Sequence, residues 1–334
     1  MVLCSASGED HMKRLFGWGT VLAVFLSFSP PAASQADPSS TITMVVPFPA
    51  GGSTDAIGRI LSEHMQVYLG QSIIIENVGG AGGSTGVGRV ARAAPDGYTI
   101  EMGQWDTHVA NGAIYALSYD VVADFEPVAL VSSNPLLILA KKAVPANDLQ
   151  GLIAWLKANP DKASQGVATA GQQVAGFLFR KQTDTRFAFV AYRGGGPAMN
   201  DLVGGHIDLM IIQAAVALPQ VRAGTIKAYA VTANSRFAAA AHIPTVDEAG
   251  LPGLHIAGWF GLFAPKGTPK NIIDRLNAAV VDALADAKVR ARLADLGQEI
   301  PPRDQQTPEA LRAYHRAEID KWWPIIKAAN IKPE

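Results

Sequence analysis

The chain has 334 residues, and its 28 Lys and Arg against 29 Asp and Glu give a formal net charge of −1 at pH 7. A balance this even provides no electrostatic attraction to nucleic acid or to an anionic membrane surface. The single cysteine, Cys4, stands in a segment that we expect to be removed. The remaining chain would then have no disulfide, no cysteine nucleophile and no thiolate metal ligand.

Residues 1–36 have the pattern of a secretory signal peptide. Lys13 and Arg14 precede an apolar run over 15–28, and small residues lead to Ser34-Gln35-Ala36. The apolar run is too short to span a membrane. We therefore predict cleavage after Ala36 and export of the mature chain. The rest of the chain is long enough for one large or two medium domains.

The first element pair of this remaining part is a strand followed by a glycine loop and a helix. The β-branched run 41–46 predicts a buried strand, and two prolines end its pairing before Ala50-Gly51-Gly52 turns the backbone. Ser53 or Thr54 is a natural N-cap. Free N–H groups and the positive end of a helix dipole would meet here, as an anion requires. An ordinary βα turn is the alternative, and a P-loop is excluded because no Gly-Lys-Ser/Thr follows.

Further strands and helices follow in alternation. We predict strands at 72–76, 98–102, 125–131, 135–140, 166–169, 187–192, 207–212, 226–231 and 259–264. We predict helices at 85–94, 107–115 with Thr107 as its cap, 149–159, 172–182, 197–203, 219–223 and 268–285. Strands that alternate with helices predict an α/β fold with a mostly parallel sheet covered on both faces. In such sheets ligands bind beyond the carboxyl ends of the strands, where these glycine loops fall.

Several motifs resemble catalytic ones without meeting their requirements. The run Gly82–Gly86 matches the nucleophile elbow, but loop residues separate its serine from the preceding strand. The run Gly86–Ala91 matches a dinucleotide fingerprint, but it lies inside a predicted helix, which favours close helix packing. An exported hydrolase using Ser53 or Ser84 remains an alternative that no histidine relay supports.

The histidines and tryptophans suggest structural roles. The six histidines after residue 36 show no i, i+4 pair, so a metal site is disfavoured and surface or capping roles are expected. Only His108 lies in a candidate cleft loop. Trp322-Trp323 indicates helix packing.

The chain resembles the solute receptors of tripartite tricarboxylate transporters, the Bug family of periplasmic binding proteins. The resemblance extends over nearly all of the predicted mature chain. The segments that carry it are 45–55 (VVPFPAGGSTD), 76–83 (ENVGGAGG), 96–99 (DGYT), 192–198 (YRGGGPA), 230–232 (AVT), 244–250 (PTVDEAG) and 259–269 (WFGLFAPKGTP).

The resemblance implies a type II periplasmic binding protein whose two α/β domains close on a ligand like a flytrap. Domain 1 would be discontinuous, 37–133 plus 255–334, and domain 2 would be 134–254. The ligand would be a small carboxylate bound largely by main-chain N–H groups, with no catalysis, cofactor or metal. The implied ligand-binding residues are Ala50, Gly51, Gly52, Ser53, Thr54, Asp55, Thr107, His108, Ala168, Thr169, Ala170, Gly171, Gln173, Tyr192 and Gln213.

The implied partners are the small carboxylate and a membrane permease of the tripartite tricarboxylate type, with the receptor itself a monomer. A membrane sensor that recognises the closed form is the alternative partner. Two positions depart from the family pattern. Gln173 stands where a histidine is common, and Gln213 stands where an aspartate or asparagine is common. Both changes remove possible charge and add amide donors and acceptors, so they bear on which carboxylate is bound.

Overall fold

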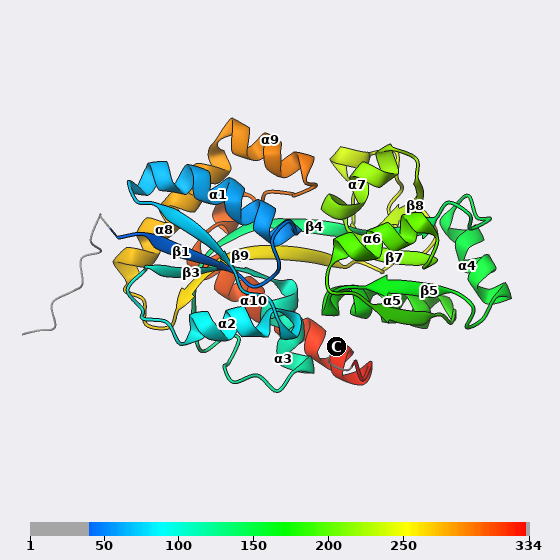
Figure 1. The fold of residues 1–334 in the computed structure, drawn as a ribbon, viewed down its shortest axis with the longest axis horizontal. Helices are drawn as coiled ribbons and strands as arrows, with labels where there is room; N and C mark the ends of the chain where they lie inside the picture. Colours follow the sequence, from blue (N-terminus) through cyan, green and yellow to red (C-terminus); the bar gives the residue numbers. More distant parts are fainter. Residues whose placement is uncertain (1–39, 332–334) are drawn as a thin grey trace, which may run out of the picture. The chain divides into compact units, whose positions relative to one another are not determined.

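The computed structural model describes residues 40–331 (Figure 1). The predicted signal peptide, its cleavage after Ala36 and Cys4 lie outside these residues. Within the described range, no helix combines the length and the apolar character needed to cross a bilayer.

The described chain alternates strands and helices, as the sequence predicts. The strands are β1 (Ile42–Val46), β2 (Ile73–Asn77), β3 (Thr99–Gln104), β4 (Phe125–Lys141), β5 (Ser164–Val167), β6 (Ala188–Ala191), β7 (Leu209–Gln213), β8 (Ile226–Val231) and β9 (Ala257–Pro265). The α-helices are α1 (Ser53–Leu69), α2 (Ser84–Ala91), α3 (Asn111–Ile114), α4 (Leu149–Ala158), α5 (Ala170–Thr183), α6 (Gly195–Gly204), α7 (Ala214–Arg222), α8 (Lys270–Ala285), α9 (Ala287–Asp295) and α10 (Pro308–Ala328). A π-helical turn, η2 (Asp106–Ala110), joins β3 to α3.

The strands form one mixed sheet in the order β2-β1-β3-β9-β4-β7-β5-β6, with β8 also paired to β4. Pairing is parallel among β1, β2 and β3, and again among β5, β6 and β7. It is antiparallel wherever β4 or β9 takes part. The prediction of a mostly parallel sheet is therefore right for the two outer groups of strands and wrong for the centre.

The long strand β4 links the two parallel groups. We predicted two strands here, but residues 132–134 stay in the ladder because they pair with the first residues of β9. The first part of β4 pairs with β9, and its last residues pair with β7 and β8. Pro135, which has no N–H to donate, is accommodated at the change of partners.

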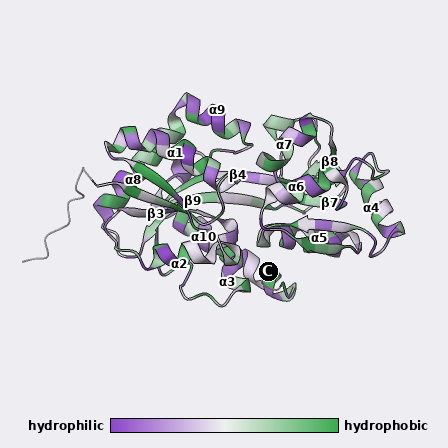
Figure 2. Cartoon of the chain, viewed as in Figure 1, coloured by the Kyte–Doolittle hydropathy of each residue, from purple (hydrophilic) through white to green (hydrophobic). Residues whose placement is uncertain are grey.

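Amphipathic helices cover both faces of the sheet. The apolar stripe of α1, which includes Ile57, Leu61 and Met65, packs with α8 and α9 in one buried cluster over β1, β3 and β9. Further along β4, Leu137 and Leu139 face α6 and α7, while Leu136 and Ile138 belong to the cluster that holds α4 and α5. Figure 2 shows the resulting alternation of hydrophilic and hydrophobic residues along the helices.

Two predictions about helix packing are confirmed. Trp322 is buried in the core on α10, and the indole N–H of Trp323 donates to the carbonyl of Val109 (2.9 Å). A Cβ added to Gly86 in α2 would lie 2.6 Å from the carbonyl oxygen of Val78 and 3.0 Å from Cα of Pro47. Close backbone packing is thus the role of this glycine.

We expect Gly86→Ala to lower the free energy of unfolding by about 2 kcal/mol, since backbone must move to admit the methyl group. Gly58→Ala is the matched control, because its Cβ in α1 would meet only side-chain atoms at 3.4 Å or more. That change should be neutral or stabilising by up to about 1 kcal/mol through helix propensity. Urea unfolding of both variants checks this, and equal effects would contradict the close-packing role.

Candidate functional site

The N-terminus of α1 lies just beyond the carboxyl end of β1. Gly51 adopts a left-handed φ of +86°, and Gly52 occupies the N-cap position with no side-chain cap. The prediction that Ser53 or Thr54 caps this helix is wrong, because the helix already begins at Ser53. The first backbone bond of the helix runs from Ala56 N–H to Gly52 O (3.0 Å). The N–H groups of residues 53–55 precede that bond and have no partner within the helix.

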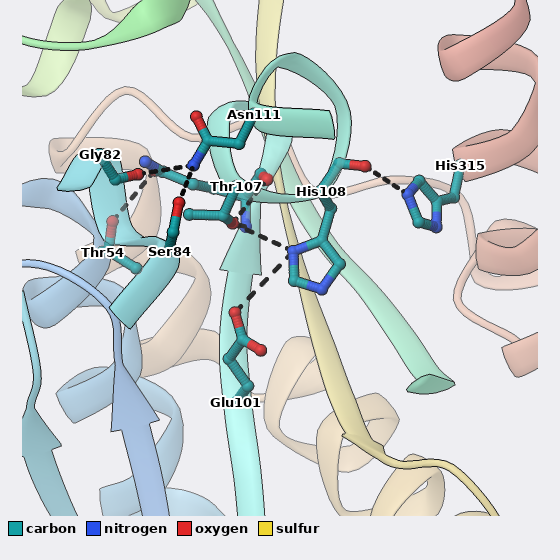
Figure 3. Close-up of polar contacts among 9 residues, drawn as sticks. Thr54, Gly82, Ser84, Glu101, Thr107, His108, Asn111 and His315 are labelled. Atoms are coloured by element: carbon teal, nitrogen blue, oxygen red, sulfur yellow. Dashed lines mark hydrogen bonds and ion pairs between the residues drawn. The ribbon is translucent and has the colours of Figure 1, made fainter. Parts of the chain in front are cut away.

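Buried hydrogen bonds fix this helix start to the end of β3. Thr54 Oγ1 donates to Gln104 Oε1 (3.0 Å), and both side chains are buried. The Gln104 N–H donates to Thr107 Oγ1 (3.2 Å). Thr107 was predicted to cap the helix that follows. This prediction is wrong, because Thr107 is the second residue of η2 and Trp105 is the N-cap. Figure 3 shows Thr54, Thr107 and their neighbours side by side.

Asp55 is occupied by structural contacts. Its Oδ2 accepts from the N–H of Gly51 (2.9 Å) and from Arg59 Nε (3.0 Å), and its Oδ1 accepts from Asn77 Nδ2 (3.0 Å). Burial raises the pKa of Asp55, but hydrogen bonds from Arg59, Gly51 and Asn77 outweigh it, so the pKa lies below its ordinary value. Asp55 thus shapes its own loop.

The facing loop, residues 168–171, includes the N-cap and the first two residues of α5, which begins at Ala170. Thr169 is the N-cap, and its side chain accepts from Gln172 N–H. Two further N–H groups of the loop are held by side chains: that of Ala168 donates to Gln172 Oε1 (2.8 Å), and that of Gly171 donates to Asp106 Oδ1 (2.6 Å). Gln172 Nε2 also donates to Gln213 Oε1 (3.3 Å), which joins this loop to the end of β7.

The structure brings most of the predicted site residues into two linked groups. Thr54, from the loop 50–55, and Thr107 both contact Gln104. Ala168, Thr169 and Gln213 contact Gln172. Gln173 is half-buried on α5, and its N–H donates to Thr169 O. Tyr192 turns to α6, where its hydroxyl donates to Asp201 Oδ2 (2.6 Å).

The sequence analysis missed Gln104, Asp106 and Gln172. Gln104 and Asp106 stand two and four residues after the predicted strand 98–102, and that position was their only signal. Gln172 was recognised only as the start of a predicted helix.

His108 is a core residue. It is fully buried, and its ring stacks on Phe263 with centroids 4.0 Å apart. His315 Nε2 donates to the carbonyl of His108 (2.7 Å) (Figure 3). The expectation that the histidines have surface or capping roles is therefore wrong for these two, because α10 packs against η2 and covers them.

A buried carboxyl lies beside His108. Glu101 Oε1 is 3.8 Å from His108 Nδ1, and neither carboxyl oxygen of Glu101 has a hydrogen-bond partner among the described residues. Burial raises the pKa of Glu101 well above its ordinary value and lowers that of His108 well below it. Burial disfavours the charged form of each group.

Ser84, the serine of the elbow-like motif, lies in a structural contact. Its hydroxyl oxygen accepts from Asn111 Nδ2 (3.4 Å), which also donates to Gly82 O (2.8 Å) (Figure 3). Over residues 40–331, no group of three or more His, Cys, Asp or Glu side chains is arranged to hold a metal ion.

A sequence profile of the receptors of the tripartite tricarboxylate transporter family matches residues 57–331. The chain belongs to this family. The receptor is similar to solved structures that it covers almost completely. MatC from Rhodopseudomonas palustris with bound malate is 40% identical with a TM-score of 0.82, over 87% of this chain and 100% of that one. The periplasmic binding protein BugD is 36% identical with a TM-score of 0.82, over 89% and 100%.

Another R. palustris protein, solved with adipate, is 32% identical with a TM-score of 0.83, over 89% of this chain and 99% of that one. Together these likenesses establish the predicted fold class, the two-domain α/β fold of the periplasmic binding proteins. They also place the receptor in a family of binding proteins and not of enzymes.

Because Glu101 is buried, the free energy of unfolding should depend on pH. Because its folded pKa is raised, its stabilising contribution is full below the unfolded pKa of about 4.3 and is lost as the pH rises toward the folded value. Glu101→Gln cannot ionise on unfolding, so its stability relative to the wild type should improve by up to about 1.4 kcal/mol per pH unit. Urea unfolding at pH 5, 6 and 7 measures this trend.

Glu299→Gln, at an exposed carboxyl, is the control and should show no such trend. A Glu101→Gln variant whose stability relative to the wild type does not change between pH 5 and pH 7 would contradict a raised pKa of Glu101.

Proposed function

We propose that this receptor captures a small carboxylate-bearing solute in the periplasm and delivers it to a membrane permease of the tripartite tricarboxylate type. The observation that carries the proposal is the N-terminus of α1, whose N–H groups at residues 53–55 precede the first helical bond. Backbone donors and the helix dipole favour an anion at this place without any basic side chain.

The proposed domains are 37–133 plus 255–334, and 134–254. The strand pairing supports this division: β4 changes partners from β9 to β7 and β8 at residues 135–136, and β9 begins at Ala257. With only two strands continuing between the domains, a hinge is expected there, and a solute that contacts both domains would favour closure.

The proposed solute-binding residues come from both domains. Gly52 and Ser53 supply backbone donors, and Ser53 adds a half-buried hydroxyl. From the other domain, Thr169, Ala170 and the Gln172–Gln213 amide pair lie at the end of the facing loop. The remaining predicted residues, including the buried His108, would support these loops from behind.

The relatives support the chemical class of the solute. MatC was solved with malate and the other R. palustris protein with adipate, and both are small acids with two carboxylates. A carboxylate group is what both of these acids share with the proposed solute.

Removing one backbone donor tests the proposal. Ser53 is the first residue of α1, where proline is well tolerated, and Gly52 before it has the extended conformation that proline requires (φ −83°, ψ 173°). Ser53→Pro should therefore fold and should weaken binding by about 1.5–3 kcal/mol, the range for a hydrogen bond to a charged group. Isothermal titration with malate and with adipate measures the loss.

Ser53→Ala is the matched control, because it removes the hydroxyl and keeps the N–H. It should weaken binding less than Ser53→Pro. A folded Ser53→Pro variant that binds these acids as tightly as the wild type would exclude the N-terminus of α1 as the site.

Closure of the two domains gives a second test. Small-angle scattering should show a smaller radius of gyration at saturating solute than without it, since the solute would hold both domains together. The Ser53→Pro variant at the same solute concentration serves as the control. An unchanged radius for the saturated wild type would contradict closure.

A further inference from the structure

A carboxylate of the chain itself occupies the N-terminus of α5. Asp106 Oδ1 accepts from the N–H of Gly171 at 2.6 Å, and Asp106 is 5% exposed. Burial raises the pKa of Asp106, and hydrogen bonds from Gly171 and Thr169 offset only part of this effect. The N-terminal donor that a second ligand carboxylate would use is therefore already taken by an acidic side chain.

Asp106 stands between the two loops of the proposed site. Two residues before it, Gln104 accepts from the hydroxyl of Thr54 at the start of α1. Asp106 itself contacts the start of α5. One short segment, 104–106, thus touches both helix N-termini, and its position is fixed by β3 on one side and by η2 on the other.

The contact with α5 is closely packed. A Cβ added to Gly171 would lie 2.9 Å from Asp106 Oδ1 and 3.2 Å from the ring of Trp105. Trp105 is buried and packs edge-to-face against Trp322 of α10, with ring centroids 5.3 Å apart. Asp106 is therefore next to a buried aromatic pair, Trp105 and Trp322. The absence of a side chain at Gly171 leaves room for the Asp106 carboxylate.

We propose that Asp106 determines which end group of a carboxylate solute the receptor accepts. The inference rests on the proposed function and narrows its solute class. With one carboxylate bound at the N-terminus of α1, the far end of the solute meets Asp106. A second carboxylate there would face a like charge, which is strongly unfavourable at close range, whereas a hydroxyl or ammonium can donate to Asp106. The receptor thus binds a monocarboxylate with a hydrogen-bond donor at its other end more tightly than the dicarboxylate of the same length.

Matched pairs of acids test this by isothermal titration. Succinate is compared with 4-hydroxybutyrate, and adipate with 6-hydroxyhexanoate, so that chain length is equal within each pair. The wild type should bind one hydroxy acid more tightly than its matched diacid. Asp106→Asn keeps the shape of the side chain and removes its charge. The ratio of the affinity for the hydroxy acid to the affinity for its matched diacid should fall by about tenfold or more, because a like-charge contact is relieved.

Asp148→Asn is the matched control. Asp148 is also a carboxylate at a helix start, accepting from Gly151 N–H at 2.7 Å on α4, but it is exposed and lies at a different helix start. The ratio of the two affinities within each pair should be the same for Asp148→Asn as for the wild type. A merely structural role for Asp106 would weaken both members of a pair alike and leave the ratio unchanged.

Three results would overturn the inference. One is that the wild type binds the diacid more tightly in both pairs. This result is measured on the wild type alone and so does not depend on the folding of a variant. Another is an Asp106→Asn ratio within threefold of the wild type. The third is that no acid in the panel binds the wild type or Asp106→Asn, which would remove the proposed function as well and is thereby distinguished from the first two.

Discussion

The antiparallel insertion of β9 between β3 and β4 is the constraint on which the rest of the structure depends. Its pairing sets Glu101 opposite Phe263 and Gln104 opposite Phe260, so the end of β3 is fixed by a strand more than a hundred residues away in sequence. Because β3 ends there, the segment 104–106 emerges between the starts of α1 and α5. The N-termini of these two helices are thereby held by buried polar contacts from a single short stretch of chain.

The same arrangement explains why ionisable side chains lie in the core. Glu101, His108 and His315 are buried between β3, η2 and α10, where aromatic rings surround them. Burial therefore raises the pKa of Glu101 and lowers the pKa values of His108 and His315, since isolated charges are disfavoured in the interior. The π-helical form of η2 fits this setting, because such turns are uncommon and are often found next to functional sites.

The proposed recognition of an anion here would depend on backbone and amide groups. Arg59 is committed to Asp55, and the described loops of the site contribute hydroxyl, amide and main-chain groups. A site of this kind has weak preferences of its own, because N–H groups bind any carboxylate. In the proposed site, selectivity would come from which N–H donors are left available. The N–H groups of Ala168 and Gly171 are already bonded to the side chains of Gln172 and Asp106.

The sequence by itself determined the parts of this protein that depend on local chemistry. The strand, glycine loop and helix over 41–69, the packing role of Gly86 and the family resemblance could all be predicted from short motifs and periodicity. Local rules placed the cap of α1 one or two residues too late, because Gly52 needs no side chain to begin a helix. The tertiary structure decided the antiparallel centre of the sheet, the burial of His108 and the meeting of Asp106 with Gly171. These features depend on pairings between residues far apart in sequence, and no local pattern of polar and apolar residues specifies which distant strand or helix will be the neighbour.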